Sequence, residues 1–129
     1  MFPNVVGTPQ EQVHEAGMSW IELIPLARCR GSGGTFVAAG GRELAVFLLD
    51  DPERIVVIDN SCPHAGGNLS GGQVAGNVVQ CPWHQWKFDL DRGVCTHSDL
   101  ARLRRYRCEV RSGVVWVDVS GDVDAPVVE

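Results

Sequence analysis

Two cysteine and histidine pairs lie in the centre of the chain, at a spacing that suits metal binding. One residue separates Cys62 from His64, two residues separate Cys81 from His84, and sixteen residues lie between the pairs. Thiolates and imidazoles are strong metal ligands, and each short loop can direct one sulfur and one nitrogen to a common centre. We therefore predict that the four side chains bind one metal centre and are not unrelated core or surface residues.

Zinc is the first metal to consider, because two cysteines and two histidines are among its structural ligand sets. A zinc finger pairs cysteine with cysteine and histidine with histidine, whereas each loop here supplies one of each. The intervening segment is also rich in glycine and not in helix formers. Two irons bridged by sulfide suit the mixed pairs better, since the thiolates can hold one iron and the imidazoles the other. A structural zinc module stays as the alternative.

The sequence around these pairs is CPH and then CPWH, followed by FDL and a glycine, and it resembles the Rieske 2Fe-2S domain. The resemblance covers about residues 20 to 120. It implies an all-β fold, in which an antiparallel β basal domain carries a cluster-binding subdomain formed by two loops. It also implies one 2Fe-2S cluster, with Cys62 and Cys81 on the inner iron and His64 and His84 on the outer, more exposed iron.

Several neighbours of the expected ligands make physical sense beside a cluster. Pro63 and Pro82 fix φ and stiffen the two loops. Trp83, Trp86 and Phe88 can shield the cluster from water, although Phe88 equally suits an ordinary core position. Four glycines are expected to permit positive φ angles and close backbone approach, so that amide groups point at the sulfurs: Gly66, Gly67, Gly71 and Gly72. Gly71 and Gly72 equally suit simple surface turns.

Respiratory Rieske proteins resemble this chain in the four ligands but differ at four nearby positions. They brace the loops with a disulfide, where this chain has Gly67 and Trp83, and they carry a serine and a tyrosine where it has Trp86 and Phe88. Fewer hydrogen bonds to the sulfurs lower the reduction potential. The pattern is instead similar to soluble Rieske ferredoxins of oxygenase systems and to the small subunit of assimilatory nitrite reductase.

The resemblance implies a one-electron carrier that takes electrons from a flavin-type reductase and passes them to a terminal oxygenase. The alternative is a small Rieske subunit of an assimilatory nitrite reductase or similar oxidoreductase complex. The catalytic subunit of an oxygenase is disfavoured by size, and because its mononuclear iron needs two further histidines and a carboxylate. Only His14 and His97 remain for that role. We identify no catalytic site within the chain itself.

The elements that must position the loops are predicted to be short strands. The chain has 129 residues, of which 44% are hydrophobic and 15 are glycine, as expected for one globular domain with many turns. The first four predicted strands indicate an antiparallel meander, and Ser112-Gly113 is predicted to be the two-residue turn of the last hairpin. The predicted strands cover residues 20–23, 35–39, 44–49, 54–59, 78–80, 87–89, 104–111 and 114–119.

The domain is predicted to span residues 18–121, between an N-terminal arm at 1–17 and an acidic tail at 122–129. A net charge of -5 disfavours nucleic-acid partners. No apolar segment reaches the length of a membrane span, and the first residues lack a basic and apolar leader. We therefore expect a cytoplasmic protein.

The cysteine count agrees with this expectation. Five cysteines, an odd number, fit poorly with a secreted disulfide framework. Three of them have no partner at motif spacing, and we expect them to be small buried side chains: Cys29, Cys95 and Cys108.

Overall fold

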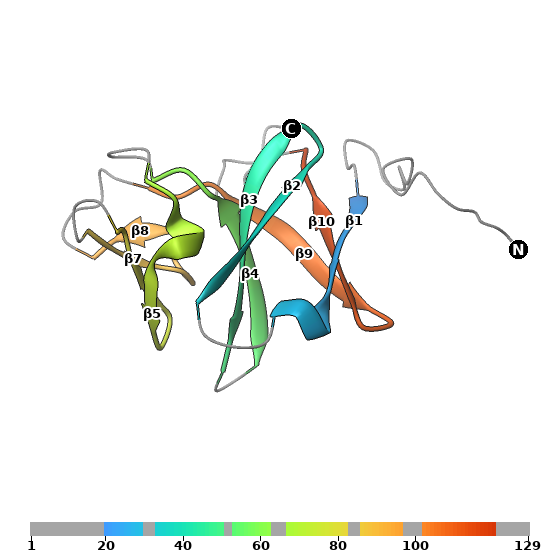
Figure 1. Cartoon of the computed structure of the whole chain (residues 1–129), viewed down its shortest axis with the longest axis horizontal. Helices are drawn as coiled ribbons and strands as arrows, with labels where there is room; N and C mark the ends of the chain where they lie inside the picture. The colour runs from blue at the N-terminus through green and yellow to red at the C-terminus, as the bar shows by residue number, and fades with distance from the viewer. Residues whose placement is uncertain are drawn as a thin grey trace, which may run out of the picture.

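The computed structural model describes residues 20–29, 33–50, 53–62, 67–82, 86–96 and 102–120, and it confirms an all-β fold of antiparallel sheets (Figure 1). A six-stranded sheet has the order β1 (Trp20–Pro25), β10 (Val114–Asp118), β9 (Arg105–Arg111), β4 (Arg54–Asp59), β3 (Arg42–Leu49) and β2 (Gly34–Ala39). A four-stranded sheet has the order β5 (Gln73–Ala75), β6 (Val78–Gln80), β7 (Lys87–Asp89) and β8 (Val94–Cys95). Two short 3-10 helices, η2 (Leu26–Cys29) and η3 (Leu69–Gly71), precede β2 and β5.

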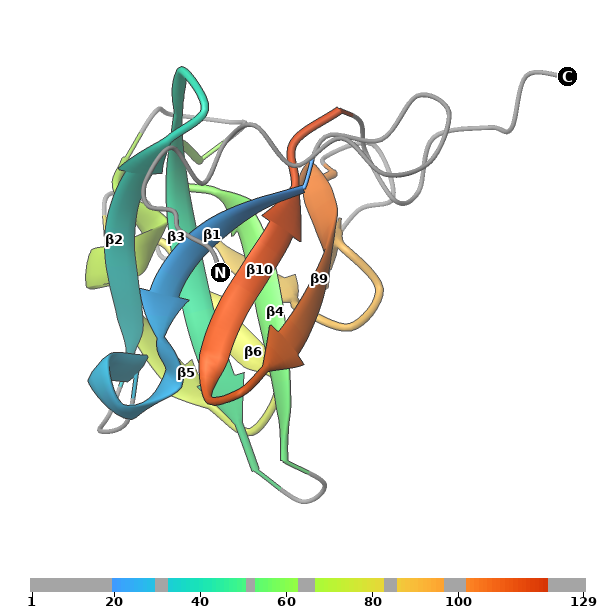
Figure 2. The same cartoon turned by 90° about the vertical axis from the view of Figure 1, so that its right-hand side faces the viewer.

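The six-stranded sheet curls into an open barrel, whose edge strands β1 and β2 approach each other (Figure 2). Side chains alternate along a strand, so every second residue of β10 points to the barrel interior. Val115 and Val117 are the two that do so, and both are fully buried, as their period-2 spacing predicts. The remaining residues of the interior core come from five other elements: Ile21, Ile24, Cys29, Leu44, Val46, Val57 and Tyr106.

Strand β3 is buried on both faces and so joins two cores. Leu44 and Val46 point into the barrel, whereas Ala45, Phe47 and Leu49 belong to a second core beneath the four-stranded sheet. An uninterrupted apolar run gives a strand no polar face to turn toward water. The second sheet therefore packs against the outside of the barrel at β3 and β4, and the ligand loops extend from this second core.

The predicted strands all appear, and β4, β6 and β7 have the predicted bounds. The prediction of one meander from the first four strands was wrong for β1. Strands β2, β3 and β4 form that meander, but β1 pairs with β10, which is distant in sequence. Pro25 lies opposite Val114 in this pairing. The last hairpin is confirmed, because Ser112 (φ 50°) and Gly113 (φ 77°) both have the positive φ of a type I′ turn.

Of the three cysteines without motif partners, Cys29 and Cys95 are confirmed as small buried side chains. Cys29 and Cys95 are 3% and 2% exposed, and Cys108 is half-buried beside the barrel core. Burial raises the pKa of the Cys108 thiol to about 11. Within the described residues, no helix has the length and apolar character needed to cross a bilayer. The predicted arm and tail, at 1–17 and 122–129, lie outside the described residues.

Candidate metal centre

Two loops with the same closure carry the expected ligands. The backbone N–H of Cys62 donates to the Gly67 carbonyl oxygen at 2.8 Å, and that of Cys81 donates to the Trp86 carbonyl oxygen at 2.7 Å. Each hydrogen bond therefore joins a cysteine to the fifth residue after it. His64 and His84 fall within the spans that these bonds close, but both histidines lie outside the described residues.

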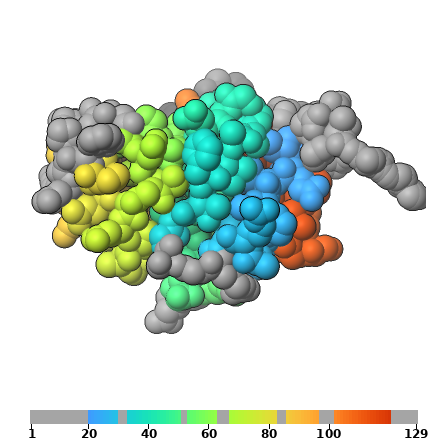
Figure 3. Space-filling view, in the orientation of Figure 1, coloured from blue at the N-terminus to red at the C-terminus, as the bar shows by residue number. Residues whose placement is uncertain are grey.

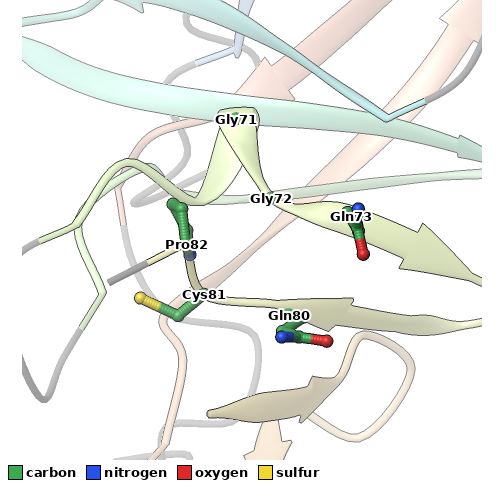
Figure 4. A pocket seen from close by; sticks show the side chains of 6 residues that line it. All are labelled: Gly71, Gly72, Gln73, Gln80, Cys81 and Pro82. Atoms are coloured by element: carbon green, nitrogen blue, oxygen red, sulfur yellow. The ribbon is translucent and has the colours of Figure 1, made fainter. Parts of the chain in front are cut away.

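Both cysteines lie in the second core. Cys62 is 2% exposed and Cys81 is fully buried, and they share one cluster of buried side chains with Leu69, Val79 and Phe88. Figure 4 shows the Cys81 sulfur directed away from the Gln80 side chain. Two buried thiols in separate closed loops match the soft, anionic ligands that an iron-sulfur cluster requires. Cys62 and Cys81, the two expected ligands that the structure describes, therefore fit the thiolate ligands of a 2Fe-2S cluster.

Asn60 ties together the two ends of the first loop. Its side chain is buried, its Oδ1 accepts the backbone N–H of Ser70 at 2.9 Å, and its Nδ2 donates to Asn68 Oδ1 at 3.1 Å. Its backbone carbonyl oxygen accepts the N–H of Leu69 at 2.7 Å. Sequence reasoning missed this residue. The available signal was a polar side chain between the apolar strand and Cys62.

A polar turn after β7 supports the second loop. Gln80 and Lys87 pair at the base of that loop, where β6 meets β7. Asp89 Oδ1 then accepts the backbone N–H groups of Asp91 at 2.9 Å and Arg92 at 3.1 Å. Gly93, at φ 73°, completes the reversal. The FDL and glycine of the motif therefore build a turn in which the aspartate holds the backbone and the glycine supplies a left-handed conformation.

Charged and amide side chains join the small sheet to the barrel. The Arg54 guanidinium of β4 donates to both carboxylate oxygens of Asp91, at 2.9 and 2.7 Å. Asn77 donates to Asp89 and Asp91 at 3.1 and 3.0 Å, and Arg105 donates to the Asp91 carbonyl oxygen. The Arg54 hydrogen bonds lower the pKa of Asp91. Asp91 is therefore a clamp between the two sheets.

The expectation of positive φ at Gly71 and Gly72 was wrong, and their backbone N–H groups donate to the carbonyl oxygens of Asn68 and Leu69. Gly72 nevertheless lies close to another backbone segment. Gly72 has φ -79°, and a Cβ there would lie 2.2 Å from the Gln80 carbonyl oxygen. A Cβ on Gly71 would meet nothing within 4 Å. Glycine at 72 is required because two backbone segments touch, and this contact depends on the fold and not on a local turn.

The neighbours of the expected ligands divide into core and surface residues. Phe88 is fully buried in the second core, and Trp86 is partly buried and packs against that core. Pro82 is exposed. Trp83, Pro63 and Gly66 lie outside the described residues.

Comparison with protein families places this architecture in a known class. Residues 19–107 match the model of the Rieske 2Fe-2S domain, which is more than half of the chain. The chain belongs to the Rieske 2Fe-2S domain family. The domain carries one 2Fe-2S cluster, the group through which Rieske domains serve iron-sulfur electron transfer.

Curated relatives are much longer than this chain. The oxygenase component of 3-ketosteroid-9-alpha-monooxygenase from Mycobacterium tuberculosis is 39% identical over 101 residues, which cover 71% of this chain and 26% of that protein. Cholesterol 7-desaturase from Xenopus laevis is 36% identical over 91 residues, or 63% of this chain and 20% of that protein. The chain therefore spans about a quarter or less of these two relatives.

Solved structures similar to this chain include longer proteins and proteins of similar length. NdmA of Pseudomonas putida superposes with a TM-score of 0.67 at 28% identity, covering 76% of this chain and 33% of that chain. The putative NADH-dependent nitrite reductase small subunit from Mycobacterium tuberculosis has a TM-score of 0.70 at 25% identity, covering 78% of this chain and 95% of that chain.

Proposed function

We propose that the chain is a Rieske ferredoxin, which takes single electrons from a flavin-type reductase and passes them to a terminal oxygenase. The observation that carries the proposal is the pair of closed loops, which bring Cys62 and Cys81 into one buried core at the end of the molecule. The oxygenase components among the curated relatives support an oxygenase as the acceptor. We place the protein in the cytoplasm, where its thiols stay reduced.

Cys62 and Cys81 would hold the inner iron, and His64 and His84 the outer iron. The cluster, when bound, supplies reversible uptake of one electron. The apolar side chains around the two cysteines exclude water from their side of the site, which limits stabilisation of added negative charge. The histidines belong to the same two loops, so their outer iron is the expected point of electron exchange with a partner.

The residues near the second loop favour a low reduction potential. Trp86 and Phe88 offer no hydroxyl group to the cluster sulfurs, so fewer donors stabilise the reduced state. We expect a potential of roughly -150 to 0 mV, the lower part of the Rieske range. Protein-film voltammetry would measure it, and the double substitution Trp86→Ser with Phe88→Tyr should raise it. A wild-type value above about +150 mV would contradict this expectation.

The second candidate is a small subunit of a nitrite reductase or similar complex. It is favoured because the match covers 95% of the length of such a subunit. Anaerobic purification with iron and sulfide analysis tests the shared part of both proposals. Zinc in place of iron and sulfide would refute both. Native complex isolation and reductase assays separate them: a carrier purifies alone and is reduced by NADH through a flavoprotein reductase, whereas a subunit stays bound to a larger chain.

A further inference from the structure

A polar groove runs from the edge of the four-stranded sheet to the second ligand loop. Two adjoining hollows, of about 400 and 450 Å³, share the segment from Gly71 to Gln73. The larger follows β5 as far as Ala75 and is also lined by Gly33 and Ser70. The smaller reaches Cys81 and Pro82 and is shown in Figure 4. In the space-filling view, η3 and β5 lie on the same face of the molecule as β2 (Figure 3).

Strand β5, which lines this groove, has backbone groups on its outer side that no described strand pairs. It is an edge strand, and no other described strand pairs with its outer side. Ala75 and Val78 flank the two-residue turn at 76–77, so this pair exchanges both ladder hydrogen bonds and the bonded pairs alternate from there. Val74, opposite Val79, therefore directs its N–H and C=O away from β6. Such an edge is a template for an extended chain.

The groove carries no charge among its described lining residues, although the chain has a net charge of -5. Gln73 and Gln80 are register partners across β5 and β6, and both line the hollow beside Cys81. Each carboxamide offers donors and an acceptor, the same groups that a peptide backbone offers. The lining therefore suits an extended, uncharged peptide segment and offers no counter-charge to an acidic or basic one.

We propose that this groove binds an extended, uncharged segment of the flavin-type reductase, which adds to β5 as a further strand. This inference rests on the electron-carrier function proposed above. A segment paired with Val74 would continue toward Cys81 and Pro82, at the start of the second ligand loop. The groove would hold the partner beside the cluster, and its small size agrees with the small, transient interfaces of electron-transfer complexes.

The test uses the holoprotein as the substrate of a flavoprotein reductase from a Rieske oxygenase system of the same cell, with NADH as electron donor. Val74→Pro removes the outward N–H but leaves the β5–β6 hydrogen bonds, since proline is tolerated on an open sheet edge. Val74→Ala is the matched control, because it loses the same side-chain packing and keeps the N–H. We expect about a tenfold higher KM for Val74→Pro and less than a twofold change for Val74→Ala.

A second variant avoids any change in strand pairing. Gly71→Trp fills the groove from a position where a Cβ meets nothing within 4 Å. Ala38→Trp, at an exposed position of β2 that does not line either hollow, is its control. We expect a similar rise in KM for Gly71→Trp and none for Ala38→Trp. The visible spectrum and reduction by dithionite should match those of the wild type in all four variants.

Three results would overturn the proposal. Wild-type KM values for both Val74→Pro and Gly71→Trp would show that the groove does not bind the reductase, while the carrier function stands. A wild-type holoprotein that accepts no electrons from the reductase would refute the carrier function and the groove together. A wild-type dimer that Val74→Pro and Gly71→Trp convert to monomers in sedimentation analysis would show that a second copy of this chain occupies the groove.

Discussion

The two sheets of this protein are stabilised in different ways. The barrel has strands of five to eight residues, whose alternating apolar side chains enclose a core. The small sheet has strands of only two or three residues, and polar contacts of Asn60, Asp89 and Asp91 hold its loops in place. Short strands bury little apolar surface, so the part of the molecule that carries the chemistry depends on hydrogen bonds and on its cofactor.

Loss of a cluster ligand should show this dependence most clearly. Cys81→Ala should give a colourless protein without bound iron, with the small sheet exchanging amide hydrogens much faster while the barrel stays protected. The same loss of iron is expected for alanine at Cys62, His64 or His84. Iron analysis and hydrogen exchange by mass spectrometry provide the measurements.

Cys108→Ala is the matched control for a thiol outside the loops, and it should keep its colour and iron content. Full iron and sulfide in Cys81→Ala would contradict the assignment of this ligand.

Removal of the Asn60 side chain should have the next largest effect. Asn60→Ala leaves the Ser70 N–H without its acceptor and loosens both ends of the first loop, at a cost of about 1–3 kcal/mol in unfolding free energy. Urea unfolding of the holoprotein measures this cost. Asn68→Ala, which removes only the exposed partner, should cost less. An equal loss in both variants would show that the buried amide has no special role in anchoring the loop.

The contact at Gly72 separates a position that needs glycine from a neighbour that does not. Gly72→Ala should destabilise the small sheet by about 1–3 kcal/mol, because its Cβ meets a backbone carbonyl oxygen that cannot move freely. Gly71→Ala should change the unfolding free energy by less than about 0.5 kcal/mol. The thermal unfolding temperatures of both variants check this difference, and equal values would show that the backbone yields at Gly72.

The clamp at Asp91 gives the smallest expected effect, together with a pH dependence. The folded-state pKa of Asp91 lies below its ordinary value of 3.8, so its contribution is fully present above that value and is lost as the pH falls through the folded pKa. Arg54→Ala should cost up to about 1 kcal/mol at pH 7, because the pair is partly exposed. Denaturant unfolding at pH 7 and at pH 3 should show the difference from wild type shrinking, and a constant difference would exclude this origin.

Local sequence patterns were sufficient to predict the barrel strands. Alternation in Val115 and Val117 and the Ser112-Gly113 turn are encoded by adjacent residues, as is the spacing of each cysteine and histidine pair. The pairing of β1 with β10 and the role of Gly72 are not encoded by adjacent residues, because each depends on contact with another segment of the chain. Strands β5 and β8 were not predicted.

The central claim is that the two closed loops hold one 2Fe-2S cluster through a cysteine pair and a histidine pair. Electron-nuclear double resonance on the reduced holoprotein, with histidine labelled by nitrogen-15, tests it most directly. In the wild type we expect the cluster to couple to two histidine nitrogens. In His64→Ala or His84→Ala we expect the cluster to be lost, and the coupling with it. A reduced cluster with no coupled histidine nitrogen would contradict the account.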